Sequence, residues 1–135
     1  MKAGIITMIC LAAALGAGAW LVVSMRNQPV TVSFDVKNTG SRAGAEVAQV
    51  YVEFPASTGE PPKRLVGWQK VFLQPAQQQL VTVQVNQNDS SHPLSWWNPA
   101  SSSWQVAPGD YAVYVGNSSS KTSLQLAGTL HIGST

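Results

Sequence analysis

The chain carries six acidic side chains, and a pair of them could serve as the catalytic groups of a glycosidase. Such an enzyme needs two carboxyl groups about 5–9.5 Å apart across a sugar-binding cleft. The acids are spread along the chain: Asp35, Glu46, Glu53, Glu60, Asp89 and Asp110. Asp35 is expected to face outward from the middle of a strand, Glu46 and Glu53 bracket another strand, and the rest fall in separate turns. The sequence therefore predicts no catalytic pair.

Two short motifs imitate hydrolase signatures. "DSSH" at 89–92 contains the three residue types of a serine triad, but adjacent residues cannot align as nucleophile, base and orienting group. It is predicted to be a polar turn. "SSSK" at 118–121 fits S-x-x-K, yet that motif needs a helix start and partner motifs that are missing here. It is predicted to be a loop, so we expect no catalytic residue in either motif.

Metal and cofactor sites are also not expected. His92 and His131 lie far apart in sequence, with no cluster of ligand-type residues near either. Cys10 is the only cysteine. The folded part of the chain is therefore expected to contain neither a disulfide nor a thiolate metal site.

Aromatic residues leave two interpretations open. Trp96 and Trp97 are adjacent, so on a strand they point to opposite faces and at most one is in the core. An exposed indole could cover a neighbouring domain, which we favour, or stack on a sugar ring while amides such as those of Asn98 and Gln69 reach its hydroxyls. The candidate interface or sugar-contact residues are Lys63, Trp68, Trp96, Trp97 and Asn98.

The length and composition predict one domain with a nearly neutral, polar exterior, and the N-terminal segment predicts export. The chain has 135 residues, enough for a single core, and charged residues make up 10%. A net charge of +2 with scattered basic residues does not indicate nucleic-acid binding. Residues 3–23 are uncharged and just long enough to cross a bilayer as a helix. We expect residues 1–28 to be a signal peptide, with a small-residue cleavage site at 17–19, or a transmembrane anchor, and the rest to be periplasmic or extracellular.

After residue 29 the pattern changes to that of short strands. Apolar and polar residues alternate over 30–36, which is typical of a half-buried strand, and this alternation with that over 80–85 predicts Val32, Phe34, Val81 and Val83 inside. Further strands are predicted at 45–54, 64–73 and 80–85, then a short hairpin over 94–106, and finally strands at 110–116 and 122–132. About seven strands with turn signals every 8–12 residues, and no convincing helix, predict an all-β antiparallel sandwich over 29–135, preceded by one apolar helix.

Residues 30 to 131 resemble the fibronectin type III-like domain at the C-terminus of glycoside hydrolase family 3 enzymes, the β-glucosidases and β-xylosidases. The matching pieces come in the family's order: "VSFDVKNTGSRAGAEVAQVYV", "PPKRLVGWQKVFLQP", "VTVQV" and "LSWWNPASSSWQVAPGDYAVYVGNSSS". The chain departs from the family pattern in three places. Trp68 replaces a usual phenylalanine, Asn98 a common aspartate, and Ala76-Gln77 the preferred Gly-Glu.

This resemblance implies a function without catalysis. In the family, the nucleophile and the acid/base belong to upstream domains that this chain does not contain. We expect an accessory module that packs against the catalytic domains of such an enzyme, from a truncated, split or wrongly started gene, with weak or no carbohydrate binding. A stand-alone carbohydrate-binding module and a membrane-anchored protein-interaction domain are the alternatives. Within the sandwich, we expect Leu65, Val71 and Leu73 in the core and Lys63, Arg64 and Lys70 along a solvated edge that discourages strand pairing.

Overall fold

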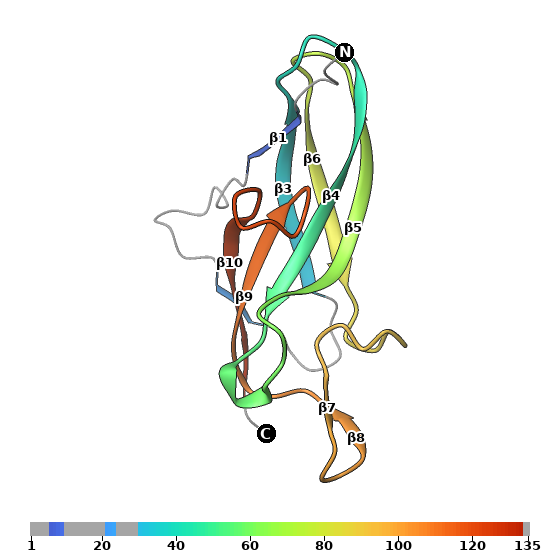
Figure 1. Cartoon of the computed structure of the whole chain (residues 1–135). Coiled ribbons are helices and arrows are strands. Elements are labelled where there is room, and N and C mark those ends of the chain that lie inside the picture. The colour runs from blue at the N-terminus through green and yellow to red at the C-terminus, as the bar shows by residue number, and fades with distance from the viewer. Residues whose placement is uncertain (1–5, 10–20, 24–29, 134–135) are drawn as a thin grey trace.

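The computed structural model describes residues 6–9, 21–23 and 30–133, and its regular structure is nearly all β-strand (Figure 1). The long strands are β3 (Val30–Asn38), β4 (Gly44–Glu53), β5 (Arg64–Leu73), β6 (Gln78–Val85), β9 (Gly109–Gly116) and β10 (Gln125–Ile132). The short elements are β1 (Ile6–Ile9), β2 (Leu21–Val23), the 3₁₀ turn η1 (Ala56–Thr58), β7 (Trp96–Asn98) and β8 (Ser103–Gln105).

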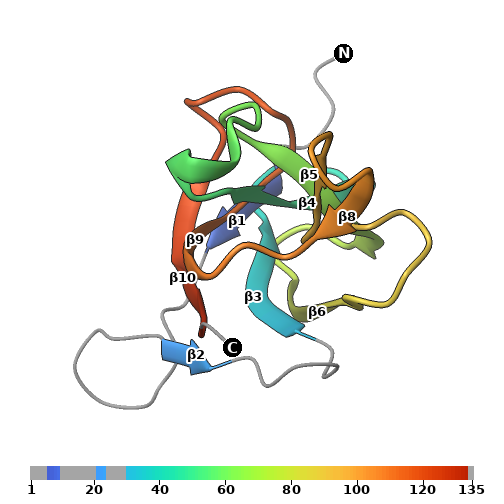
Figure 2. The same ribbon diagram turned by 90° about the horizontal axis from the view of Figure 1, so that it is seen from below.

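Two sheets pack face to face, which confirms the predicted sandwich. One sheet has the order β1-β3-β6, and the other has the order β2-β10-β9-β4-β5. Neighbouring strands are antiparallel except β2, which runs parallel to β10. Figure 2 shows the two layers from below, with β3 and β6 in one and β4, β5, β9 and β10 in the other. The small β7–β8 hairpin projects at the lower end of the sandwich (Figure 1).

The core follows from the alternation of valine with polar residues. Phe34 lies opposite Val81, and Val32 opposite Val83. All four are at most 5% exposed, as predicted from the sequence. The inner faces of β4, β9 and β10 supply the facing layer. β-branched side chains suit such a surface because they pack well against the pleated neighbours of the opposite sheet.

A β-bulge interrupts the alternation near the start of β5. Gly67 pairs with Val50, but Leu65 pairs with Tyr51, the next residue of β4. Val66 is therefore the extra residue, and it packs partly buried against the core. An extra residue in one strand reverses the face on which the side chains before it point.

This bulge overturns two of our expectations for β5. Val71 and Leu73 are in the core, as predicted. Leu65 was predicted to be inside but is 44% exposed, because the bulge turns it to the outer face. Arg64 was predicted to lie on a solvated edge, yet the same shift places it opposite an inward-facing position of β4. Lys70 is exposed, as expected of an edge residue.

Tyr111 fixes the crossing from one sheet to the other at the start of β9. Its ring is fully buried and packs edge-on against Phe54, with 5.2 Å between centroids. Its hydroxyl donates a hydrogen bond to the Ala107 carbonyl four residues upstream. A tyrosine that bonds back to the backbone before this strand is a recurrent feature of Greek-key sandwiches. Burial raises the pKa of Tyr111 to about 12.

The N-terminal segment differs from the predicted apolar helix in the parts that the structure describes. Ile6–Ile9 pairs with β3, and Leu21–Val23 pairs with β10. Both stretches contain β-branched residues, which favour strands, and each lies at an open sheet edge. The other residues of 1–28 lie outside the described part, so the signal or anchor stays a prediction. Among the described residues, no helix has the length and apolarity to span a membrane.

Candidate functional site

The five candidate contact residues do not form one site. Lys63 lies on the outer face of the larger sheet, with its Nζ 4.8 Å above the Tyr114 ring centroid. Trp68 is on β5 and 65% exposed. Trp96 packs partly buried against the core, while Trp97 and Asn98 lie on the hairpin. Three surfaces therefore have to be considered separately.

The first surface is an apolar row across four strands of the larger sheet. Strand register places Leu126 of β10 beside Tyr114 of β9, Tyr114 beside Tyr51 of β4, and Tyr51 beside Leu65 of β5. Leu126 and Leu65 are exposed, whereas Tyr51 is buried beneath its neighbours. We call these four residues the outer-face row. The two tyrosine hydroxyl groups of the row have hydrogen-bond partners. The Tyr114 hydroxyl donates to the Glu53 carboxylate, and the Tyr51 hydroxyl donates to the Gln49 side chain.

Most of this row was not predicted from the sequence. Leu65 was assigned to the core, and Leu126 was not singled out. An alternating strand shows which residues share a face, but not which face is covered. The signal that could have revealed the row is the presence of apolar residues on both faces of the strands at 45–54 and 110–116, which leaves part of the outer face apolar.

The second surface is a groove at the seam where β5 and β6, each the last strand of its sheet, approach one another. It has a volume of about 300 Å³ and is lined by Gly67, Trp68, Gln69, Thr82, Val83 and Gln84. Gly67 allows the close approach, because a Cβ at this position would lie 2.6 Å from Cγ1 of Val83. Gln84 was not identified from the sequence.

The third surface is the aromatic cluster on the β7–β8 hairpin. The Trp104 ring stacks on His92 at 4.5 Å between centroids and meets Trp97 edge-on at 5.7 Å. Asn98 stabilises the turn of the hairpin, because its side-chain Oδ1 accepts a hydrogen bond from the Ala100 N–H and its side-chain Nδ2 donates one to Gln105. The amide of Asn98 is thus engaged within the hairpin.

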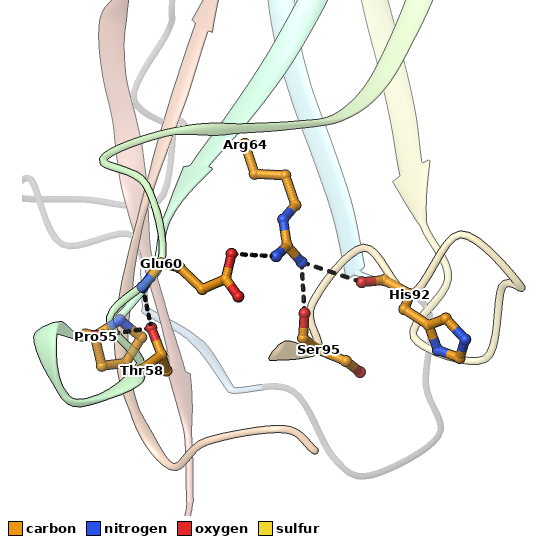
Figure 3. Close-up of polar contacts among 6 residues, drawn as sticks. All are labelled: Pro55, Thr58, Glu60, Arg64, His92 and Ser95. Carbon is orange, nitrogen blue, oxygen red and sulfur yellow. Dashed lines mark hydrogen bonds and ion pairs between the residues drawn. The ribbon is translucent and has the colours of Figure 1, made fainter. Parts of the chain in front are cut away.

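Arg64 anchors the segment that carries this hairpin, as Figure 3 shows. Its Nη1 donates to the backbone carbonyls of His92 at 3.3 Å and Ser95 at 2.5 Å, and its Nη2 pairs with Glu60 at 2.6 Å. The guanidinium also lies 4.3 Å from the Phe54 ring centroid. A planar fork with several donors suits this multiple contact, which a lysine could not make. Arg64 is thus a structural residue that sequence reasoning assigned to solvent.

Five of the six described acids have a separate local partner. Their contacts are Glu46 with the Val47 N–H, Glu53 with Tyr114, Glu60 with Arg64, Asp89 with the Ser91 N–H, and Asp110 with His131. None of these contacts joins two carboxyl groups. Asp35 is only 7% exposed rather than open to solvent, because strands flank β3 on both sides. Within 6–9, 21–23 and 30–133, no group of three or more His, Cys, Asp or Glu residues could hold a metal ion.

The two motifs that resemble hydrolase signatures have the predicted structures: "DSSH" is a turn and "SSSK" lies in a loop. In "DSSH", Asp89 accepts hydrogen bonds from the backbone N–H groups of Ser91 and His92. The bonds from Ser91 hold the pKa of the Asp89 carboxyl below its usual range, and the nearby His92 adds to this. In "SSSK", the Ser118 hydroxyl bonds to Ser123 within the loop between β9 and β10.

Comparison with known proteins gives the same architecture. Residues 46–119 match the family model of the fibronectin type III-like domain. Among solved structures, β-glucosidase 3B from Thermotoga neapolitana superposes with a TM-score of 0.73 at 28% identity over 97% of this chain and 16% of that one. A β-D-glucoside glucohydrolase from Trichoderma reesei superposes with a TM-score of 0.66 at 36% identity over 76% of this chain and 14% of that one.

Curated relatives are much longer than this chain. A probable β-glucosidase D from Aspergillus niger is 42% identical over 101 residues, covering 75% of this chain and 13% of that protein. A probable β-glucosidase N from Emericella nidulans is 39% identical over 92 residues, covering 68% of this chain and again 13% of the relative. The chain thus spans about one eighth of the curated relatives it matches.

Proposed function

Because the chain belongs to the fibronectin type III-like domain family, we propose that it is a non-catalytic accessory domain of a family 3 β-glucosidase-like glycoside hydrolase. The observation that carries this proposal is the extent of the match. Relatives named as β-glucosidases contain this region as 13% of their length. A domain of this kind acts by packing against the catalytic part of the enzyme and stabilising it.

The outer-face row is the surface that supports such packing best. It runs unbroken across β10, β9, β4 and β5. Leu126 at 60% and Leu65 at 44% exposure give it apolar ends. Exposed apolar surface of this kind marks contacts with other proteins or domains. Lys63, whose Nζ lies 4.8 Å above the Tyr114 ring centroid, adds a positive charge to this surface.

Location is part of the same proposal. The apolar residues 3–23 support export, either through a cleaved signal peptide or with a membrane anchor that is retained. Partner and substrate follow from the relatives' names and are accordingly proposed to be a β-glucosidase catalytic region and β-glucosides.

The experiment is a chimera. The matching region of the Aspergillus niger β-glucosidase D is replaced by residues 30–133 of this chain, and the melting temperature is compared with that of the enzyme lacking the region. We expect the chimera to regain stability. Leu126→Asp is expected to lower the melting temperature of the chimera more than that of the isolated chain.

A matched control is available on the opposite sheet. Leu80 is 63% exposed, close to the 60% of Leu126, but it lies on β6 away from the row. Leu80→Asp should leave the chimera unchanged relative to the isolated chain. Equal effects of the two substitutions would rule out the outer-face row as the packing surface.

A further inference from the structure

The edge of the larger sheet that lies farthest from β5 carries a strand from the N-terminal segment. β2 follows β10 at this end of the strand order. Leu21–Val23 pairs with Thr129–His131 in parallel orientation, over three residue pairs. Figure 2 shows β2 beside the end of β10 at the rim of the sandwich. This edge of the sheet therefore accepts an added strand within the chain itself.

A β-bulge limits the part of β10 that can accept a strand. The register of β10 on β9 shifts between Leu126 and Gly128, so Ala127 is the extra residue. A bulge disrupts the regular spacing of the backbone groups and discourages pairing along its strand. The pairing with β2 begins beyond the bulge and covers Thr129–His131. We call these three residues the β10 edge.

The centre of the β10 edge selects for an apolar residue in the added strand. Leu130 is 1% exposed and belongs to the core. A residue that pairs with Leu130 lies on the same face of the sheet, since directly opposite residues of neighbouring strands share a face. There it meets a hollow between the two sheets, which is lined by Val30–Val32, Val113 and residues 127–130. None of these lining residues is charged, so a charged residue at this position would be desolvated without a partner.

The two ends of the β10 edge make weaker demands on the added strand. Thr129 and His131 alternate with Leu130 and therefore belong to the outer face of the sheet. Nδ1 of His131 lies 2.6 Å from Oδ1 of Asp110 on β9, and both side chains are largely exposed. Polar or apolar residues can lie beside such a solvated pair. The edge thus fits an extended segment that is apolar at its centre and pairs through its backbone.

We propose that the β10 edge is a strand-acceptor site for an extended apolar segment of a second protein, which adds to the sheet parallel to β10. In the free chain, Leu21–Val23 occupies the place of that partner strand. Main-chain hydrogen bonds give strand addition its affinity, and alternate side chains give it selectivity. The inference does not depend on the accessory function. The outer-face row uses side chains on one face of the sheet, whereas this site is the edge of the sheet.

The chain's own segment controls access to the β10 edge. Residues 3–23 cannot span a bilayer and pair with β10 at the same time, so a retained anchor opens the edge. Cleavage at 17–19 instead leaves Leu21–Val23 attached, and the edge stays covered. A tethered strand competes at an effective concentration of about 1 mM or more. A separate partner strand therefore binds the covered edge more weakly than the open one.

The test is a titration of the full chain with a peptide that has the sequence of residues 19–26, followed by the amide chemical shifts of the chain. Val22→Asp in the chain is the variant that opens the edge, because it places a charge opposite Leu130. Val22→Ile is the matched control, since it keeps an apolar, β-branched residue there. We expect saturable shifts at Thr129–Ile132 of the Val22→Asp chain, with a dissociation constant on the order of 0.1–1 mM. Binding to the Val22→Ile chain should be at least about fivefold weaker.

A second peptide, which carries the Val22→Asp substitution itself, measures the selectivity at the centre of the edge. It should not bind. Equal binding of the two peptides overturns the proposal, as does a lack of saturation by the first peptide up to about 5 mM on the Val22→Asp chain.

Two further outcomes are decisive. Should the Val22→Asp chain not fold, the parent chain is titrated instead, and the first peptide should shift the same amides at higher concentration. No shift there up to about 10 mM overturns the proposal. Shifts at these amides that depend on the concentration of the chain alone would identify a second copy of the chain as the donor, which also overturns the assignment to a separate protein.

Discussion

Ala76 is strained by its place in the turn between β5 and β6. Its φ is +65°, in the left-handed region that L-residues avoid at a cost of about 1–2 kcal/mol. The turn is held in that form because the Ala76 N–H donates to the Asn38 carbonyl and the Gln74 N–H donates to the Gln77 side chain. The family resemblance places a glycine at this position, and the backbone geometry gives the physical reason.

Replacing Ala76 by glycine should therefore stabilise the domain. The relief of strain exceeds the added entropy of a glycine in the unfolded chain, so we expect a gain of roughly 0.5–1 kcal/mol in the free energy of unfolding. Urea denaturation measures it. Ala100→Gly serves as a control at an exposed position whose φ is not positive. A loss of stability in Ala76→Gly would contradict the strain argument.

Because of Tyr111, the stability of the domain is expected to fall at alkaline pH. Burial raises its pKa from 10.0 to about 12. A raised folded-state pKa contributes stability that is complete below the unfolded-state value and is lost as pH rises toward the folded-state value. The loss therefore falls between about pH 10 and pH 12.

Tyr111→Phe tests both contributions of this residue. At pH 7 the variant loses the bond to the Ala107 carbonyl, which we expect to lower the free energy of unfolding by about 1–2 kcal/mol. Between pH 10 and 12 its stability should fall less steeply than that of the parent chain. Tyr114, whose pKa is also raised by partial burial and by Glu53, leaves part of the dependence in place. Parallel pH curves would contradict the assignment.

Phe34 is the largest wholly buried side chain of the smaller sheet, at 0% exposure. Phe34→Ala removes this packing and leaves a cavity, which should lower the free energy of unfolding by about 3–5 kcal/mol. Thermal or urea unfolding of the full chain measures the change. Ser33→Ala, the adjacent substitution on the outer face, is the control and should change stability by less than about 1 kcal/mol. Similar losses for both variants would mean that the faces of β3 are assigned wrongly.

At the scale of elements, the sequence predicted most of the fold. Period-two patterns located β3, β5 and β6 and identified the inward faces of β3 and β6 correctly. It did not reveal the bulge, because Val66 is an ordinary strand residue and its effect depends on the partner strand β4. The misplacement of Leu65 and Arg64 followed from that one register shift. The groove was also out of reach, since it needs the relative position of β5 and β6, which no local pattern encodes.

Arg64 joins β5 to the segment that precedes the hairpin, and its removal is an element-scale test. Arg64→Met keeps the apolar stem but leaves the His92 and Ser95 carbonyls and Glu60 without this donor. Hydrogen bonds to charged groups contribute about 1.5–3 kcal/mol each, so we expect a loss of at least about 2 kcal/mol. Hydrogen exchange should quicken at 89–98 and not in β3 or β6. Lys121→Met, an exposed control, should change neither quantity. Unaltered exchange at 89–98 would contradict the anchoring role.

At the scale of the whole molecule, the chain matches a domain that its relatives carry beside much larger regions. Five of the six described acids are held in separate local contacts, and none of these contacts joins two carboxyl groups. The purified chain is therefore expected not to hydrolyse aryl β-glucosides or aryl β-xylosides. Release of nitrophenol measures this. Turnover that disappears on replacing one aspartate or glutamate would show that the chain is an enzyme.

Val66, the extra residue of β5, can be removed without moving its neighbours to the other face of the sheet. Deleting its single codon would leave the reading frame intact and give β5 a regular alternation. Leu65 would still lie opposite Tyr51 on the outer face and Arg64 opposite Val52, because the deleted residue is the one without a partner on β4. The outer-face row and the Arg64 anchor would therefore be kept, and only the packing of Val66 against the core would be lost. The pattern in the sequence misplaced Leu65 and Arg64 because it counts one residue that the strand pairing skips.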